Sequence, residues 1–201
     1  MKLAPLIMSA EPIEAISSYL DALSPAERLR CVQQLSKREQ RVLYVRAEAA
    51  PPLSLDDFAP AHTTLQEVIH DGRNSLPIFS LFQKRFCRAN DGSGRVFGYN
   101  QGATTAWIGP GYFIAKSTAD HPVWRARGSV IIDYYEVPAA DVVPSWPKII
   151  PNDSGLQRLV YYKMRDFMRR VSTHVSVGIA YQNGKSLGQY FVLCRAPEAR
   201  I

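Results

Sequence analysis

Five polar side chains in the second half of the chain have the residue types that a binding or catalytic site needs. They are Asp133, Lys163, His174, Ser176 and Gln189. A histidine or an aspartate can act as a general base, and a lysine can hold a substrate carboxylate or phosphate. If these side chains converge, they predict a pocket for a small molecule that is anionic or partly apolar. Whether that pocket also does catalysis stays open, with His174 or Asp133 as the base.

Lys163 is unusual because it falls on the apolar face of the segment 155–171. Helical periodicity predicts a helix over this segment, and Lys163 projects between Leu159 and Phe167. An ammonium that is buried without a partner is strongly destabilising. Two interpretations follow: Lys163 runs along the helix edge to Asp166, or it points into a pocket and meets an anionic or carbonyl group.

The polar side chains near the C-terminus belong to a hairpin predicted over residues 174–195. Asn183-Gly184 is typical of a type I′ turn, and a two-residue loop there pairs Gly178 with Gln189. This register collects polar or small residues on one face: His174, Ser176, Gly178 and Gln189. The histidine is either a hydrogen-bonded structural residue or a base, and a glycine in mid-strand allows another group to approach closely.

Asp133 lies in the middle of the strand predicted over residues 129–137. Both faces of this strand are largely apolar, which is typical of a central strand. A carboxylate at such a position is either paired with an arginine or exposed to solvent, or it points into a cavity.

The elements that must position these residues divide the chain into three parts. Residues 1–50 predict a helical arm of three short helices, with capping boxes starting at Ser24 and Ser36. Pro51-Pro52 opens a linker over residues 51–62. Residues 63–201 predict an α+β body.

Within the body, patterning predicts helices over residues 64–88 and strands near residues 96–100, 104–108 and 112–116. The expected fold is therefore α+β. A curled antiparallel sheet or partly open barrel of about five to six strands is covered by helices, with the helical arm outside.

Several chemistries lack their sequence signatures. There is no GxSxG motif, no Rossmann fingerprint and no CxxC or HxxxH spacing, so no metal site or cofactor is predicted. The apolar run at residues 3–8 is too short to span a bilayer or to form a signal peptide. We therefore expect a cytoplasmic protein with reduced thiols that does not engage a membrane.

Residues 151–201 carry most of the net charge of +6, with eight basic and three acidic residues. This excess favours an alternative function, a protein-interaction module that uses the predicted basic helix, residues 156–171, and the helical arm. Self-association through the N-terminal helices would belong to that alternative. Binding of nucleic acid is a further one, although Asp166 interrupts the basic run.

Overall fold

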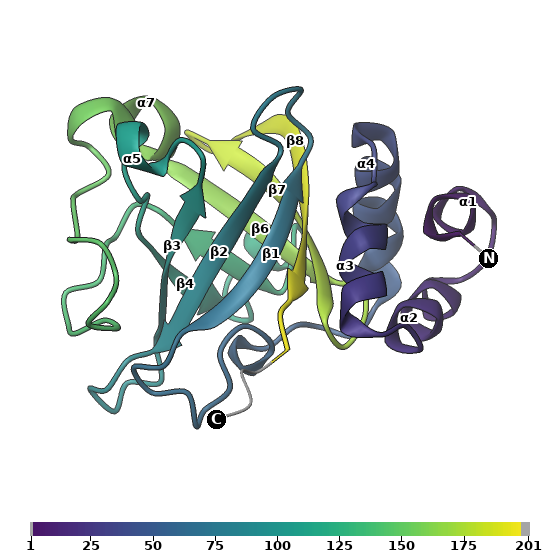
Figure 1. The fold of residues 1–201 in the computed structure, drawn as a ribbon, viewed down its shortest axis with the longest axis horizontal. Coiled ribbons are helices and arrows are strands. Elements are labelled where there is room, and N and C mark those ends of the chain that lie inside the picture. The colour runs from purple at the N-terminus through teal and green to yellow at the C-terminus, as the bar shows by residue number, and fades with distance from the viewer. Residues whose placement is uncertain (1, 198–201) are drawn as a thin grey trace.

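Eight antiparallel strands form a closed barrel in the computed structural model, which describes residues 2–197 (Figure 1). Neighbouring strands pair in sequence order, and the last strand returns to the first, so that Asp71 faces Gln83 on one side and Cys194 on the other. The strands are β1 (Val68–Asn74), β2 (Leu81–Arg88), β3 (Val96–Gly102), β4 (Phe113–Ser117), β5 (Val130–Asp133), β6 (Met164–Arg170), β7 (Val175–Gln182) and β8 (Lys185–Arg195). The α+β class and the antiparallel sheet are confirmed, whereas the predicted partly open barrel with fewer strands is wrong.

The first fifty residues form helices that cover the barrel wall beside β7, β8 and β1. They are α1 (Leu3–Met8), α2 (Ile13–Asp21), α3 (Pro25–Gln33), α4 (Lys37–Arg46) and a 3₁₀ turn at Ala47–Ala49. The helices α3 and α4 lie against the barrel and α1 and α2 lie outside them (Figure 1). Ser24 and Ser36 form capping boxes at the starts of α3 and α4, as predicted.

Three apolar clusters hold these layers together. One fills part of the barrel interior around Phe86 and Phe113. A second joins α1–α4 to the outer wall around Val177 and Val192. The third lies on the opposite wall, where residues 137–149 cross the barrel.

Glycines inside the barrel make room for aromatic rings. At three of the cross-strand pairs between a glycine and a phenylalanine, a Cβ atom on the glycine would clash with the facing ring: Gly72–Phe82, Gly98–Phe113 and Gly178–Phe191. A Cβ atom at Gly178 would lie 2.4 Å from the Phe191 ring, so only glycine fits there. The close approach expected at Gly178 is therefore made by the protein's own side chain.

One end of the barrel is closed by residues 52–59, which we call the plug and which include a 3₁₀ turn at Leu55–Asp57. Leu53 and Phe58 are buried in the interior cluster. His70 of β1 stacks on the Phe58 ring, and its Nε2 lies 3.0 Å from the Phe58 carbonyl oxygen. The segment predicted to be a linker, 51–62, thus contributes side chains to the core.

The predicted helix over 155–171 is wrong. The chain forms a 3₁₀ turn at Gly155–Gln157 and a short helix, α7 (Arg158–Tyr161), and then becomes strand β6. Lys163, with a φ of +55°, lies at the break between them. Helical periodicity misled here because Phe167 and Met168 are both buried, one on each face of the strand.

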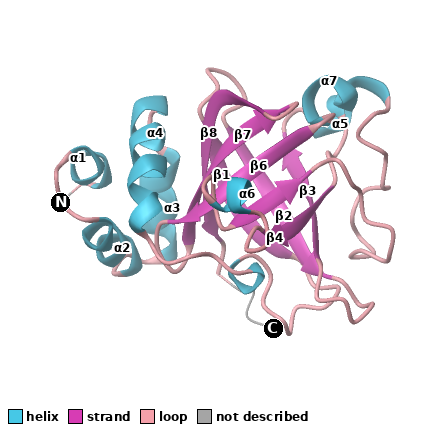
Figure 2. Cartoon of the chain, turned by 180° about the vertical axis from the view of Figure 1, so that it is seen from behind, coloured by secondary structure: helices cyan, strands magenta, loops and turns pink. Residues whose placement is uncertain are grey.

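The helices predicted over 64–88 are also wrong, because this region forms β1, β2 and the turn between them. The predicted strand at 104–108 is instead the short helix α5 (Thr105–Ile108). The remaining helix, α6 (Pro122–Arg125), lies against the outside of the barrel, away from α5 and α7 (Figure 2).

The C-terminal hairpin is confirmed, with Gln182 opposite Lys185. An irregularity between Ile179 and Tyr181 shifts the register beyond the turn. Gly178 therefore faces Phe191 rather than Gln189, a shift of two residues that keeps each side chain on its predicted face. Across residues 2–197, no helix combines the length and apolarity needed to cross a membrane.

Candidate functional site

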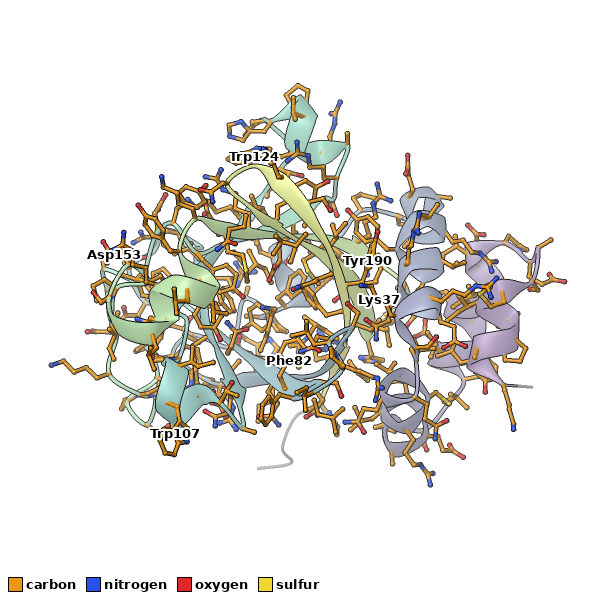
Figure 3. The ribbon with its side chains drawn as sticks, turned by 90° about the horizontal axis from the view of Figure 1, so that it is seen from above. Lys37, Phe82, Trp107, Trp124, Asp153 and Tyr190 are labelled. Atoms are coloured by element: carbon orange, nitrogen blue, oxygen red, sulfur yellow. The ribbon has the colours of Figure 1, made fainter. Side chains whose placement is uncertain are left out.

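A cavity of about 510 Å³ occupies the end of the barrel opposite the plug. Its mouth lies between the β1–β2 turn, α5, α7 and the β7–β8 turn, which gather at one end of the barrel (Figure 1). Figure 3 looks down on this end, with Phe82 on the barrel wall and Trp107 at the outer edge. An eight-stranded barrel is just wide enough to be filled by side chains or to hold one small ligand.

Four polar side chains, which we call the polar cluster, line the inner part of this cavity: Lys84, Asn100, Tyr134 and Asp166. The Lys84 ammonium donates to Asn100 Oδ1 at 2.8 Å and to Tyr134 Oη at 2.5 Å, and it lies 3.0 Å from Asp166 Oδ2. Tyr134 also contacts Asp166 Oδ2 at 3.2 Å. The cluster joins strands β2, β3 and β6 to the residue that follows β5.

Lys84 and Asp166 are both buried, with side chains only 2% exposed. Aromatic rings lie beside the ammonium, and its nitrogen is 5.1 Å from the ring centres of Phe113 and Phe191. The negative faces of aromatic rings stabilise a desolvated cation. The ammonium therefore has three oxygen partners and two aromatic rings beside it.

Burial dominates the titration of this cluster. It lowers the pKa of Lys84 and raises the pKa of Asp166, although the attraction between the two charges opposes both shifts. Burial also raises the pKa of Tyr134 well above its ordinary value, so this phenol stays neutral. The cluster is therefore neutral overall.

Asp166 keeps one hydrogen-bonding position unused. Its Oδ1 atom is buried and has no partner among the residues that the structure describes. A buried carboxylate oxygen without a partner is costly, so this atom favours an incoming N–H or O–H donor. Lys84 offers no such position, because its three N–H groups match its three oxygen partners.

The helix α7 covers part of the mouth. Its Tyr161 stacks on Tyr134 with ring centres 5.3 Å apart. Gly111, with a φ of +56°, lies under the Tyr161 ring, and its N–H points to Gln157 Oε1 at 3.3 Å. The segment that contains α7 thus packs on the Gly109-Pro110-Gly111 turn.

The five residues singled out from the sequence do not converge. Lys163 and His174 lie at opposite ends of β7, roughly 25 Å apart along the strand. The Lys163 ammonium lies over the Tyr162 ring, and His174 accepts a hydrogen bond from Arg195 at 3.3 Å. The site expected from their convergence is therefore absent.

The other three residues also separate. Asp133 pairs with Arg165 at 3.3 Å and lies 3.6 Å from Lys116, so the interpretation as a carboxylate paired with an arginine is correct. Ser176 is buried near the plug. Of the five, only Gln189 lines the cavity.

The polar cluster itself was missed from the sequence. One of the two interpretations of Lys163 paired it with Asp166, but the partner of Asp166 is Lys84, on a strand that was predicted to be a helix. The sequence did contain a signal for these strands, a charged residue at the centre of a five-residue segment whose first and last residues are apolar. In Phe82-Gln83-Lys84-Arg85-Phe86, Lys84 lies on the same strand face as the two phenylalanines. Met164-Arg165-Asp166-Phe167-Met168 repeats it with the opposite charge.

Among residues 2–197, no group of three or more histidine, cysteine or acidic side chains is placed to hold a metal ion. Comparison of the chain with protein families, curated proteins and solved structures gave no significant match. The functional argument therefore depends on the geometry of the cavity.

Proposed function

We propose that the protein binds one small, mostly apolar molecule in the barrel cavity, and that a neutral head group of the ligand donates a hydrogen bond to Asp166. The observation that carries this proposal is the largely apolar cavity of about 510 Å³, whose lining includes Asp166, a carboxylate with one buried and unpartnered oxygen, Oδ1. This volume is within the range of small-molecule sites. Gln189, which lines the same cavity, would offer this ligand a second polar contact.

The charge balance of the polar cluster favours a neutral ligand over an anionic one. Lys84 is the cluster's cation, and its charge is already matched by Asp166 at 3.0 Å. Binding an anion there would require Asp166 to take up a proton. The occupied donors of Lys84 also favour a binding role over a nucleophilic one, because an ammonium has no free electron pair.

The protein-interaction alternative loses its main support. Arg165, a residue of the predicted basic helix, lies against Tyr135 and pairs with Asp133. Arg169 donates to the carbonyl of Tyr44 and pairs with Glu48. The apolar residues of α1–α4 pack within the same chain. Self-association through the N-terminal helices, a cytoplasmic location and the less favoured alternative of nucleic-acid binding stay predictions.

Two fluorescent probes with the same ring skeleton test the proposal. N-phenyl-1-naphthylamine is neutral and carries an N–H donor, whereas 1-anilinonaphthalene-8-sulfonate adds a negative charge. We expect the neutral probe to bind at one site per chain and more tightly than the sulfonate. Tighter binding of the sulfonate would contradict the neutral head group.

A matched pair of variants locates the bound probe. Ala180 lines the cavity, so Ala180→Leu should lower the affinity for the neutral probe at least tenfold. Ala126→Leu adds the same volume at an exposed site after α6 and should change nothing. Equal affinities for the two variants, with both shown to be folded by circular dichroism, would place the probe outside the barrel.

A further inference from the structure

The mouth of the cavity is surrounded by apolar side chains that face solvent. The β1–β2 turn exposes Ile78 and Phe79 by 69% and 61%, and Leu159 of α7 is 78% exposed. Trp107 of α5 is 82% exposed, and Leu187 of the β7–β8 turn is 40% exposed. We call the four segments 75–81, 103–108, 155–163 and 183–188 the rim.

This concentration is specific to one end of the molecule. Most of the large apolar side chains exposed by residues 2–197 belong to the rim, and the others are scattered over several elements. Single exposed apolar residues are ordinary, but a contiguous group marks an interaction surface. Here the group encircles the entrance through which an apolar ligand must pass.

The charges of the rim have one sign. Its four segments contain no aspartate or glutamate, and they contain three cations: Arg158, Lys163 and Lys185. All three are exposed, and none forms an ion pair with the described part of the chain. Apolar tips with interspersed cations match the interface of a bilayer that contains anionic lipids.

We infer that the rim docks on an anionic lipid bilayer, with its apolar tips in the interfacial region and its cations at the head groups. This surface differs from a flat protein-binding face because its apolar residues stand on separate turns around an opening. Docking would let an apolar ligand enter the barrel without crossing water. Membrane docking goes beyond the proposed ligand binding and does not depend on it, since the rim is exposed whatever the cavity holds.

The expectation of no membrane contact came from the absence of an apolar segment long enough to span a bilayer. Docking at the interface requires no such segment, because it uses short exposed tips that reach only the head-group region. The two statements concern different modes of interaction.

Co-sedimentation with vesicles tests this inference. We expect the full-length protein to bind vesicles of phosphatidylcholine mixed with phosphatidylglycerol, and to bind phosphatidylcholine alone at least tenfold more weakly. Trp107 should report insertion through a blue shift of its fluorescence, which Trp107→Phe should abolish.

Matched variants separate the rim from the rest of the surface. Phe79→Ser combined with Leu159→Ser should lower binding to anionic vesicles at least tenfold, and Arg158→Glu combined with Lys185→Glu should do the same. The controls Val123→Ser and Arg125→Glu change an exposed apolar residue and an exposed cation of α6, away from the rim, and should have little effect.

Three results would overturn the inference. They are no binding to either kind of vesicle, equal losses in the rim variants and the α6 controls, or rim variants that change only the oligomeric state in sedimentation. The last would assign the rim to a protein contact. None of these results would affect probe binding in the cavity, so failure of docking and failure of the proposed function are distinguishable.

Discussion

At one end of the barrel the chain fills the interior with its own side chains, and at the other end it leaves a cavity of about 510 Å³. The plug places Phe58 inside the closed end, and Arg88 donates from β2 to the Ala59 carbonyl oxygen at 2.7 Å. Arg170 of β6 binds the carbonyl of Pro52 from another side. Two arginines thus fix the closed end, while short turns and helices surround the open one.

This difference separates stability from binding within one barrel. Close packing at the plug stabilises the fold, because Leu53 and Phe58 are buried in the interior cluster. The open end keeps a buried charge pair and an empty volume, both of which reduce stability. The predictions below test this division, from the largest expected change in unfolding free energy to the smallest.

Removing the plug's aromatic ring should have the largest effect. Phe58→Ala should lower the unfolding free energy by about 4 kcal/mol, because the ring is buried and its removal leaves a void. Urea unfolding followed by circular dichroism gives this value. Phe79→Ala at the exposed rim is the control, with an expected change below about 0.5 kcal/mol. Similar losses at both positions would remove the distinction between the two ends.

Breaking the charge pair comes next. Lys84→Met should cost about 3 kcal/mol, since it leaves Asp166 buried without its cation. The double variant Lys84→Met with Asp166→Leu should recover most of this loss, because no buried charge remains. The same denaturation experiment decides. A double variant less stable than Lys84→Met would show that Asp166 is held by something other than the lysine.

His70 should make the closed end sensitive to acid. Burial lowers the pKa of His70 to about 3, whereas an unfolded histidine titrates near 6.5. Between these values the unfolded state binds the proton, so stability falls as the pH decreases through 6.5. From pH 6.5 to 5 the loss due to His70 should be roughly 1.5 kcal/mol.

The variant His70→Gln isolates this contribution. The unfolding free energy of the wild type minus that of the variant should decrease as the pH is lowered from 6.5 to 5. A constant difference would mean that His70 titrates normally in the folded protein. Carboxylates that also titrate in acid contribute equally to both proteins and cancel.

Two glycine substitutions test whether contact with Tyr161 holds α7 at the open end. Gly111→Ala and Gly155→Ala both place a side chain at a φ near +55°, but only Gly111 lies against the Tyr161 ring. Gly111→Ala should therefore cost about 1 kcal/mol more than Gly155→Ala. Hydrogen exchange should show faster exchange of residues 155–163 in the first variant alone. Equal exchange in both would mean that Tyr161 moves aside without releasing α7.

Local signals in the sequence predicted the elements that depend on neighbouring residues. The caps at Ser24 and Ser36 and the turn at Asn183-Gly184 specify backbone geometry through side chains a few residues apart. Barrel closure depends on pairing between β1 and β8, which no local pattern encodes. For that reason the number of strands and their closure could not be predicted.

The polar cluster was hidden for a related reason. Lys84 and Asp166 occupy inward positions on β2 and β6, where alternation predicts apolar residues. Each charge interrupts the strand pattern of its own segment, and only their contact across the barrel explains both. Lys84 and Asp166 therefore form the site and also made β2 and β6 difficult to recognise as strands from the sequence.

The pairing of β1 with β8 also has a consequence for synthesis. His70 pairs with Arg195, so the barrel wall cannot close until nearly all of the described chain has left the ribosome. Contacts between such distant residues slow folding, because a long loop must be ordered first. Until β8 arrives, β1 and β7 are unprotected edges to which other nascent chains can pair. The cavity itself is thus a late product of folding, and a chain that stalls before β8 would be prone to aggregation.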